Sequence, residues 1–360
     1  MKRKSITVFF IIFAAFAASV RAAQEFRLGP LVAPPGEVRS GSLEVVGPEG
    51  EKTFIPLTVI HGARPGRTAA FVAGTHGAEY PPILALQRIR DALDAKKLAG
   101  TVILVHISNL PSFRKRTIYY SPVDGLNLNR VYPGDPSGTL SRRIAFVMTE
   151  QIVKRCDVLV DMHCGDSNED LMPYTYWMIS GRAPLDEESK SLALAFGLPT
   201  IIIDTTREKD PAHSKYLGNT AMLLGKAAIT TEAGRLGQTD EESVTANVRG
   251  VWSVLRRLGM VAGDAAPVHD PVWIDKYEVV NSERDGLFAA RVRSGDRVQA
   301  GQVVGVLRDY WGMVPSEIRA PFAGLILYVI GTPPANAGEP LFEVGRIRRA
   351  DSAGLAFRLE

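Results

Sequence analysis

RTAAFVAGTHGAEYPPILALQRIRDALDAKK, residues 67–97, decides the fold of this chain. It opens with an apolar run typical of a buried strand, and its second half repeats apolar residues at helical spacing with charged residues between them. Two prolines, Pro81 and Pro82, suit the first turn of that helix. The linking loop carries His76 and Glu79. The stretch predicts a strand followed by a helix, joined by a loop that is either a polar turn or half of a metal site.

The same alternation of strand and helix continues to about residue 260. The predicted strands are 101–108, 157–164, 200–204 and 227–234, and the predicted helices are 140–156, 186–197 and 240–259. This alternation predicts an α/β fold with a central mixed sheet flanked by helices. Residues 25–47 are expected to add a pair of edge strands.

The composition changes after residue 260. A connection rich in Gly, Ala and Pro covers residues 260–271, and short strands with turn signals follow it. We therefore expect two domains after the N-terminal leader: a catalytic domain in residues 23–260 and a small C-terminal all-β, barrel-like domain in residues 268–347.

The first 22 residues have the pattern of a secretory signal peptide. Basic residues precede an apolar stretch from Ile6 to Val20, and small residues end at Ala22. A membrane anchor is the alternative, but this stretch is shorter than the roughly 20 residues that a spanning helix needs. We expect the mature protein to be exported to the periplasm and to have no membrane span after the signal peptide is cleaved.

Charge argues against a nucleic-acid partner. Cleavage after Ala22 removes four basic residues, which lowers Lys+Arg from 42 to 38 against 39 Asp+Glu and changes the formal net charge from +3 to −1. A nucleic-acid-binding protein normally needs a basic surface. The oligomeric state is left open by the sequence.

The two cysteines, Cys156 and Cys164, are predicted not to form a disulfide. The residues between them read as a buried strand, and eight residues of extended chain cover about 26 Å. A disulfide requires the two Cα atoms to lie within about 7 Å.

Several predicted strands end in imidazole or carboxylate side chains. His76 and Glu79 follow the first strand, Asp161 and His163 end the third, and Glu232 ends the last. In open α/β sheets functional groups collect at the carboxyl ends of strands. Two histidines and one glutamate make the ligand set of a catalytic zinc site, which leaves a fourth position open. We expect His76, Glu79 and His163 to bind zinc, with Asp161 behind the site.

Glu232 and the loop 124–135 complete the candidate site. A carboxylate beside zinc can take a proton from water and pass it to a leaving amine, and Glu232 is the candidate for this role. The loop, DGLNLNRVYPGD, carries Arg130. Its planar guanidinium matches a carboxylate, so Arg130 is a candidate for binding one. The alternative is that Arg130 is a surface residue of a turn.

Four motifs carry a resemblance to a known family. GTHGAE, NLNRVYPGD, DMHCGD and TEAG stand in the order and spacing of the succinylglutamate desuccinylase and aspartoacylase family, relatives of the zinc carboxypeptidases. The resemblance implies that one zinc is bound by His76, Glu79 and His163. It implies that Asn129 and Arg130 hold a substrate carboxylate and that Glu232 is the general base and acid. The reaction it implies is hydrolysis of an amide.

The sequence departs from the family pattern at two places. Family members usually carry an arginine a few residues before the Pro of the P-x-D-G segment, where it steadies the oxyanion. Here Tyr119 stands near that place and the nearest arginine is Arg116, so either residue is a candidate donor. In addition, Asn127 replaces the aspartate that carboxypeptidases place two residues before the Asn-Arg pair; an Asn still accepts a hydrogen bond from a ligand histidine.

The C-terminal region resembles the biotinyl and lipoyl fold through SEIRAPFAGLI, residues 316–326. The turn in residues 309–317, where such domains carry a modified lysine, has no lysine. We therefore expect no swinging cofactor, and a domain that shapes or covers the mouth of the active site.

Together these features predict an exported zinc-dependent amide hydrolase that removes the acyl group of an N-acyl amino acid or a similar small carboxylate. A zinc carboxypeptidase or amidase acting on cell-wall peptides shares every residue named above and stays open as an alternative. A third possibility is an inactive binding protein on the same scaffold, although such a protein would not need Glu232. A serine hydrolase is disfavoured because no G-x-S-x-G motif is present.

Overall fold

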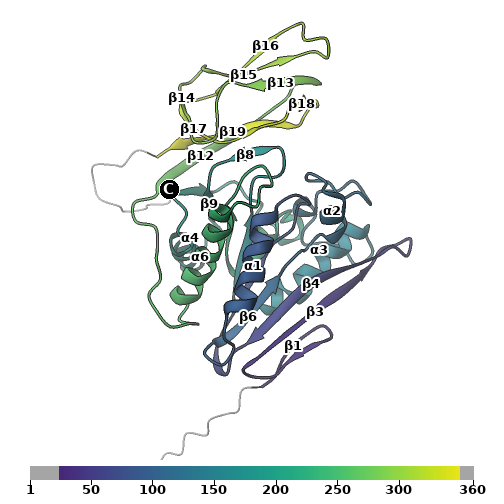
Figure 1. The fold of residues 1–360 in the computed structure, drawn as a ribbon, viewed down its shortest axis with the longest axis vertical. Coiled ribbons are helices and arrows are strands. Elements are labelled where there is room, and N and C mark those ends of the chain that lie inside the picture. Colours follow the sequence, from purple (N-terminus) through teal and green to yellow (C-terminus); the bar gives the residue numbers. More distant parts are fainter. Residues whose placement is uncertain (1–23, 349–360) are drawn as a thin grey trace, which may run out of the picture.

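The computed structural model describes residues 24–348, so the predicted signal peptide lies outside the described residues. A mixed sheet runs through the whole described part of the chain, with helices on both faces (Figure 1). The helices are α1 (Tyr80–Ala92), α2 (Leu110–Lys115), α3 (Leu140–Gln151), α4 (Ala183–Phe196), α5 (Leu217–Leu223) and α6 (Glu241–Arg257), with short 3-10 turns η1 (Leu128–Arg130), η2 (Val153–Arg155) and η3 (Pro211–His213).

The strands fall into an N-terminal, a central and a C-terminal set. They are β1 (Phe26–Leu28), β2 (Leu31–Ala33), β3 (Glu37–Val46), β4 (Lys52–His61), β5 (Arg64–Val72), β6 (Ala99–Val105), β7 (Val158–His163), β8 (Glu169–Leu171), β9 (Tyr174–Met178), β10 (Thr200–Asp204), β11 (Ala227–Glu232), β12 (Val272–Asn281), β13 (Gly286–Ala290), β14 (Arg297–Val298), β15 (Val303–Arg308), β16 (Ser316–Arg319), β17 (Gly324–Ile330), β18 (Pro334–Ala335) and β19 (Pro340–Ile347).

The predicted fold class is confirmed: the central sheet is mixed and flanked by helices. Its order is β14-β17-β19-β12-β10-β9-β11-β7-β5-β6-β4-β3. Strands β6, β5, β7 and β11 are parallel neighbours. Strand β4 is antiparallel to β6, and β9 is antiparallel to β11 but parallel to β10. The sequence analysis did not predict β4, β8, β9, α2 or α5. The expected edge strands are present as β3, at the edge of this sheet, and as the separate pair β1-β2.

Alternating residues of the central strands feed two hydrophobic cores, because successive side chains of a strand point to opposite faces. Phe71 of β5 packs with helices α1, α4 and α6 on one face, whereas Val72 packs with α3 and α5 on the other. In β7, Val160 belongs to the first core and Leu159 to the second. Helices therefore cover both faces of the central strands. Because the faces are covered, the ends of the strands are where functional groups can collect.

The C-terminal strands gather at one end of the molecule (Figure 1, yellow-green). Part of this region continues the central sheet, because β12 pairs in parallel with β10. The remaining strands form antiparallel ladders, including a second sheet of order β16-β15-β13-β18, with a hydrophobic core of their own. Strand β8, just after β7, pairs with β17 and ties this region to the central strands. The division of the chain into two domains stays a prediction.

Two sequence expectations concern single features. Cys156 and Cys164 are both free and buried; Cys156 precedes β7 and Cys164 directly follows it. Within residues 24–348, no helix is both long and apolar enough to cross a bilayer.

His106, at the end of β6, is expected to make stability depend on pH. Its ring is buried, and its Nε2 lies 2.9 Å from Oγ1 of Thr58. Burial lowers the pKa of His106 from 6.5 to about 4, and Arg90 contributes in the same direction. The unfolded chain therefore binds this proton first, so the free energy of unfolding should decrease as the pH falls from 6.5 towards 4.

The measurement is urea unfolding of the wild type and of His106→Gln at both ends of this range. The variant should lose less stability on acidification than the wild type. Equal losses in the two proteins would show that His106 does not carry the effect.

Candidate active site

Three adjacent parallel strands bring the predicted metal ligands together. Strand β5 pairs with β7, and β7 pairs with β11, so their carboxyl ends meet at one edge of the sheet. His76 and Glu79 lie in the loop between β5 and α1, His163 is the last residue of β7, and Glu232 is the last residue of β11.

His76, Glu79 and His163 form a buried group whose ligand atoms all lie within 4.8 Å of one another. Glu79 lies between the two histidines: its Oε1 is 2.5 Å from Nδ1 of His76, and its Oε2 is 2.9 Å from Nδ1 of His163. The loop can take this path because residue 77 is glycine. A Cβ on Gly77 would lie 2.3 Å from the carbonyl oxygen of Ser112.

The outer nitrogen of each histidine faces an oxygen acceptor. Nε2 of His76 lies 3.2 Å from Oδ1 of Asn127, and Nε2 of His163 lies 3.2 Å from Oδ1 of Asp161. Acceptors at these positions favour the tautomer that carries the proton on Nε2 and leaves the Nδ1 lone pair free. Both Nδ1 atoms then point at the position between the rings where Glu79 also lies, which suits a metal ion.

The unequal acceptors behind the histidines lead to a prediction about metal affinity. Asp161→Asn removes the carboxylate behind His163 and should weaken metal binding by a factor of about 10–100, because the ligand becomes less basic. Asn127→Asp adds a carboxylate behind His76 and should strengthen metal binding. Competition with a chromogenic chelator measures both affinities. If the two variants shift affinity in the same direction, basicity is not what these residues control.

The charge of the group favours an ionised Glu79. Burial alone would raise its pKa, but His163 and His76 outweigh burial and hold the pKa at about 2. A carboxylate that stays ionised at all ordinary pH values is available as a metal ligand.

Glu232 lies beside this group on the neighbouring strand. The register of β11 places Glu232 opposite His163 of β7 and opposite Tyr174 of β9. Its side chain is half-buried, and burial raises its pKa well above the usual range, although His163 acts in the opposite direction. A carboxyl group whose pKa is raised holds a proton more readily, which suits a group that accepts a proton and later returns it.

Asn129 and Arg130 reach the site from η1. Asn129 is buried, its Oδ1 accepts the N–H of Leu217 at 3.0 Å, and its Nδ2 lies 3.4 Å from Nε2 of His163. Arg130 donates to the carbonyl oxygen of Asn129 and stacks on the ring of Tyr216, with 4.6 Å from Cζ to the ring centroid. Its guanidinium is therefore oriented while its side chain stays exposed to an incoming carboxylate.

The structure separates the two candidate oxyanion donors. The ring of Tyr119 meets that of His76 edge-on, with 5.8 Å between centroids, so Tyr119 lies at the site. Its hydroxyl donates to Oε1 of Glu169 at 2.7 Å, which commits its proton. Arg116, just after α2, has an exposed side chain that makes no hydrogen bond or ion pair with residues 24–348. The structure thus places Tyr119 against the ring of His76, whereas within residues 24–348 no hydrogen bond or ion pair ties the side chain of Arg116 to the metal group.

Three charged residues near the site were missed by the sequence reading. Asp166 and Glu169 follow His163 closely, are buried, and act electrostatically on His76. Arg207 follows β10, pairs with Asp204 and also stacks on the ring of Tyr216, at 4.0 Å from Cζ to the ring centroid. The rule that located Glu232 would have located Arg207, because both follow a strand of the same sheet.

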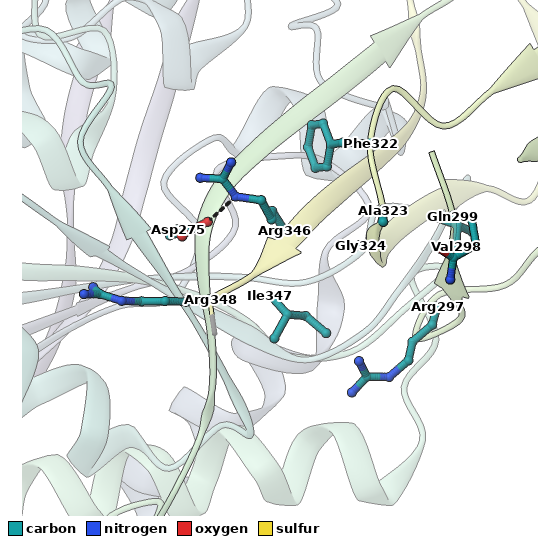
Figure 2. A pocket seen from close by; sticks show the side chains of 10 residues that line it. All are labelled: Asp275, Arg297, Val298, Gln299, Phe322, Ala323, Gly324, Arg346, Ile347 and Arg348. Atoms are coloured by element: carbon teal, nitrogen blue, oxygen red, sulfur yellow. Dashed lines mark hydrogen bonds and ion pairs between the residues drawn. The ribbon is translucent and has the colours of Figure 1, made fainter. Parts of the chain in front are cut away.

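A larger cavity, of about 850 Å³, lies in the C-terminal region and shares no lining residue with the metal group. Arg297, Arg346 and Arg348 line it, but Figure 2 shows their guanidinium groups pointing in different directions. Arg346 is paired with Asp275 at 2.8 Å. This cavity lacks the converging groups of the site at the strand ends.

Comparisons with known proteins agree with this site. The family model of the succinylglutamate desuccinylase/aspartoacylase catalytic domain matches residues 65–258. An N-alpha-acetyl-L-2,4-diaminobutyric acid deacetylase from Halomonas elongata is 33% identical over 303 residues, which cover 82% of this chain and 86% of the relative.

Two solved structures extend the similarity to the C-terminal region. A succinylglutamate desuccinylase from Silicibacter sp. TM1040 has a TM-score of 0.76 and 27% identity, and the match covers 88% of this chain and 97% of that one. The product-bound ectoine utilization protein EutE from Ruegeria pomeroyi also has a TM-score of 0.76 and 27% identity, covering 86% and 95%.

The class of protein that this fold and these matches define is an amide deacylase. The chain belongs to the succinylglutamate desuccinylase/aspartoacylase family.

Proposed function

We propose that this protein is a zinc-dependent hydrolase that removes the acyl group from an N-acyl amino acid. The observation that carries the proposal is the convergence of His76, Glu79 and His163 within 4.8 Å, with Glu232 on the adjacent strand. The name of the Halomonas elongata relative, a deacetylase of an acetylated amino acid, supports the same reaction class.

The residues present fit one zinc ion. Two imidazoles and one carboxylate are the ligands of catalytic zinc sites that leave a fourth position open. Oε1 and Oε2 of Glu79 each face the Nδ1 atom of one histidine, at 2.5 Å from His76 and 2.9 Å from His163, so the three side chains direct their ligand atoms to one place. Zinc in such a site supplies Lewis-acid polarisation of a carbonyl and lowers the pKa of water to about 7.

The protein's own residues have separate tasks in this reaction. Arg130 and Asn129 bind the substrate carboxylate and so fix the amide relative to Glu232. Glu232 accepts a proton from the attacking water and delivers it to the leaving amine. Asn127 and Asp161 hold the two histidines in position through their Nε2 atoms.

Metal analysis and an amine-release assay test the proposal. The full chain is expressed and purified, its zinc content is measured, and release of amine is followed with N-acetyl amino acids and with cell-wall peptides. We expect about one zinc per chain and turnover of the acetylated amino acids. Turnover of peptides alone would assign a peptidase instead, and bound zinc without turnover of either class would favour a binding protein.

We also propose that the protein is exported to the periplasm. The basic start, the apolar stretch and the small residues up to Ala22 support a cleaved signal peptide. Expression of the full chain in a host with a periplasm, followed by fractionation and N-terminal sequencing, should give a mature protein that starts at Ala23. Recovery of the intact N-terminus in the cytoplasm would contradict export.

A further inference from the structure

The turn between β15 and β16 carries the most exposed large apolar side chains of the described residues. They are Tyr310, Trp311, Met313 and Val314, which together we call the apolar tip. Their exposed fractions lie between 61% and 79%, whereas no other large apolar side chain in residues 24–348 exceeds 52%. Single exposed apolar residues are common on soluble proteins, but a contiguous group of them marks an interaction site.

Hydrogen bonds hold this turn in one shape. Oδ1 of Asp309 accepts the N–H of Trp311 at 3.2 Å and the N–H of Met313 at 2.7 Å. The N–H of Asp309 donates to the carbonyl oxygen of Met313 at 3.1 Å. Arg284, which lies just before β13, donates to the carbonyl oxygen of Val314 at 2.7 Å. The backbone of the turn is therefore tied down while the four apolar side chains face solvent.

The backbone at Val314 is strained. Its φ of 49° lies in the left-handed region, which a β-branched residue rarely adopts. The side chain of Val314 stays 66% exposed, so burial does not offset this strain. Strained residues of this kind collect at functional sites, where the strain fixes a needed shape. The turn thus has the features of a binding element.

The shape and size of the apolar tip favour a lipid bilayer over a protein partner. Figure 1 shows β15 and β16 at the upper end of the molecule's longest axis. A hairpin end is convex, so two tips from two copies of the chain cannot cover one another. Two aromatic and two smaller side chains offer roughly 500 Å². A stable protein interface buries about 800 Å² on each partner. A bilayer needs no matching groove, and its affinity scales with the apolar area that enters it.

The residue types at the turn also suit a bilayer surface. Tyrosine and tryptophan are enriched at membrane–water interfaces because each has an apolar ring with a polar group. Arg308 directly precedes the turn, is exposed, and makes no hydrogen bond or ion pair within residues 24–348. The nearby acids are engaged, Asp309 by backbone N–H groups of the turn and Glu317 by Arg319. Leu287, opposite Arg308 in the register of β13 and β15, extends the exposed apolar surface. An unpaired guanidinium beside apolar side chains suits contact with lipid phosphates.

We propose that the apolar tip docks on the surface of a phospholipid bilayer and that Arg308 contacts anionic headgroups there. This inference does not depend on the proposed deacylase function. Because β12 pairs with β10, the C-terminal strands and the central sheet are joined by backbone hydrogen bonds. Docking through the tip therefore holds the strand ends that carry the metal group at a set orientation to the membrane.

The test measures vesicle binding by the protein that expression of the full chain in a host with a periplasm yields. The vesicles are phosphatidylcholine alone and phosphatidylcholine mixed with phosphatidylglycerol. Trp311 is the one exposed residue of four tryptophans, since Trp177 is buried and Trp252 and Trp273 are partly buried. We expect the tryptophan emission to shift to shorter wavelength with vesicles and to be quenched by brominated lipids. Co-sedimentation gives the partition coefficient.

Three variants assign the binding to the tip. Trp311→Ser combined with Met313→Ser should lower the partition coefficient by about tenfold or more, because two apolar side chains no longer enter the bilayer. The matched control is Val46→Ser combined with Phe54→Ser, an exposed apolar pair on β3 and β4, which should bind like the wild type. Arg308→Gln should lower binding to the phosphatidylglycerol vesicles by about fivefold and leave binding to phosphatidylcholine unchanged.

The contrary outcomes are equally specific. A wild type that binds neither kind of vesicle overturns the proposal, and so does a Trp311→Ser, Met313→Ser variant that binds as well as the wild type. A wild type that instead self-associates in analytical ultracentrifugation, and loses this in the same variant, assigns the tip to a second copy of the chain. Turnover of an N-acetyl amino acid without vesicles should be equal in all variants, which shows that they are folded and separates this test from that of the deacylase function.

Discussion

Replacing Glu232 by glutamine is expected to lower kcat by a factor of about 10²–10⁴ and to leave zinc bound. Glutamine keeps the size of the side chain and its place opposite His163 at the end of β11, but it cannot accept a proton from water or return it to an amine. Because Glu232 is not among the three ligand residues, the metal content should stay at the wild-type value.

Glu242→Gln is the matched control for this experiment. Glu242 lies in the first turn of α6, is exposed, and is also replaced by its amide. Steady-state kinetics on an N-acetyl amino acid and zinc content are measured for both variants. A Glu232→Gln enzyme that keeps wild-type kcat would remove Glu232 from the proton-transfer role, and loss of zinc from it would make Glu232 part of the metal site instead.

The metal group could be predicted because simple rules place it. In the sequence, each predicted strand of the central sheet is an apolar run, and neighbouring parallel strands have their carboxyl ends at the same edge of the sheet. His76, His163 and Glu232 stand at such ends, so their meeting follows once the strands are recognised. Asp161 could also be placed, because it shares a strand face with His163.

The surroundings of the metal group could not be predicted in the same way. Glu169 lies on β8, a strand of three residues, which is too short to show a period and whose partner, β17, comes much later in the chain. Tyr119 was recognised as a site residue, but its hydroxyl proton goes to Glu169, 50 residues away, and no local rule selects that acceptor. The hydrogen bond that commits the Tyr119 proton therefore could not be predicted from the sequence.

The C-terminal region shows a similar limit. Its short strands and turn residues predicted an all-β region, and the antiparallel ladders agree with that reading. The pairing of β12 with β10 was not predicted. A strand with an alternating pattern can pair with the central sheet or with the sheet β16-β15-β13-β18, and its own residues do not determine its partner. This pairing matters for function, since it places the C-terminal strands next to the strand ends that carry the site.

Replacing His163 by alanine is expected to lower the zinc content to well below one per chain and to abolish measurable turnover. The side chain supplies one of three ligands, and a site left with His76 and Glu79 has too few protein ligands for a stable tetrahedral zinc site. The change also removes the imidazole that faces the buried carboxylate of Asp161 and one of the two that face Glu79, so some loss of stability is expected as well.

His106→Gln is the control, because His106 is a buried histidine that directly follows a strand of the same sheet but lies outside the metal group. Zinc is measured by elemental analysis after dialysis, and folding is checked by circular dichroism. The control should keep about one zinc per chain and wild-type turnover. Should His163→Ala fold, retain zinc at the level of His106→Gln and still hydrolyse the substrate, the ion would have to be bound elsewhere, and the assignment of the strand ends of β5 and β7 as the metal site would be wrong.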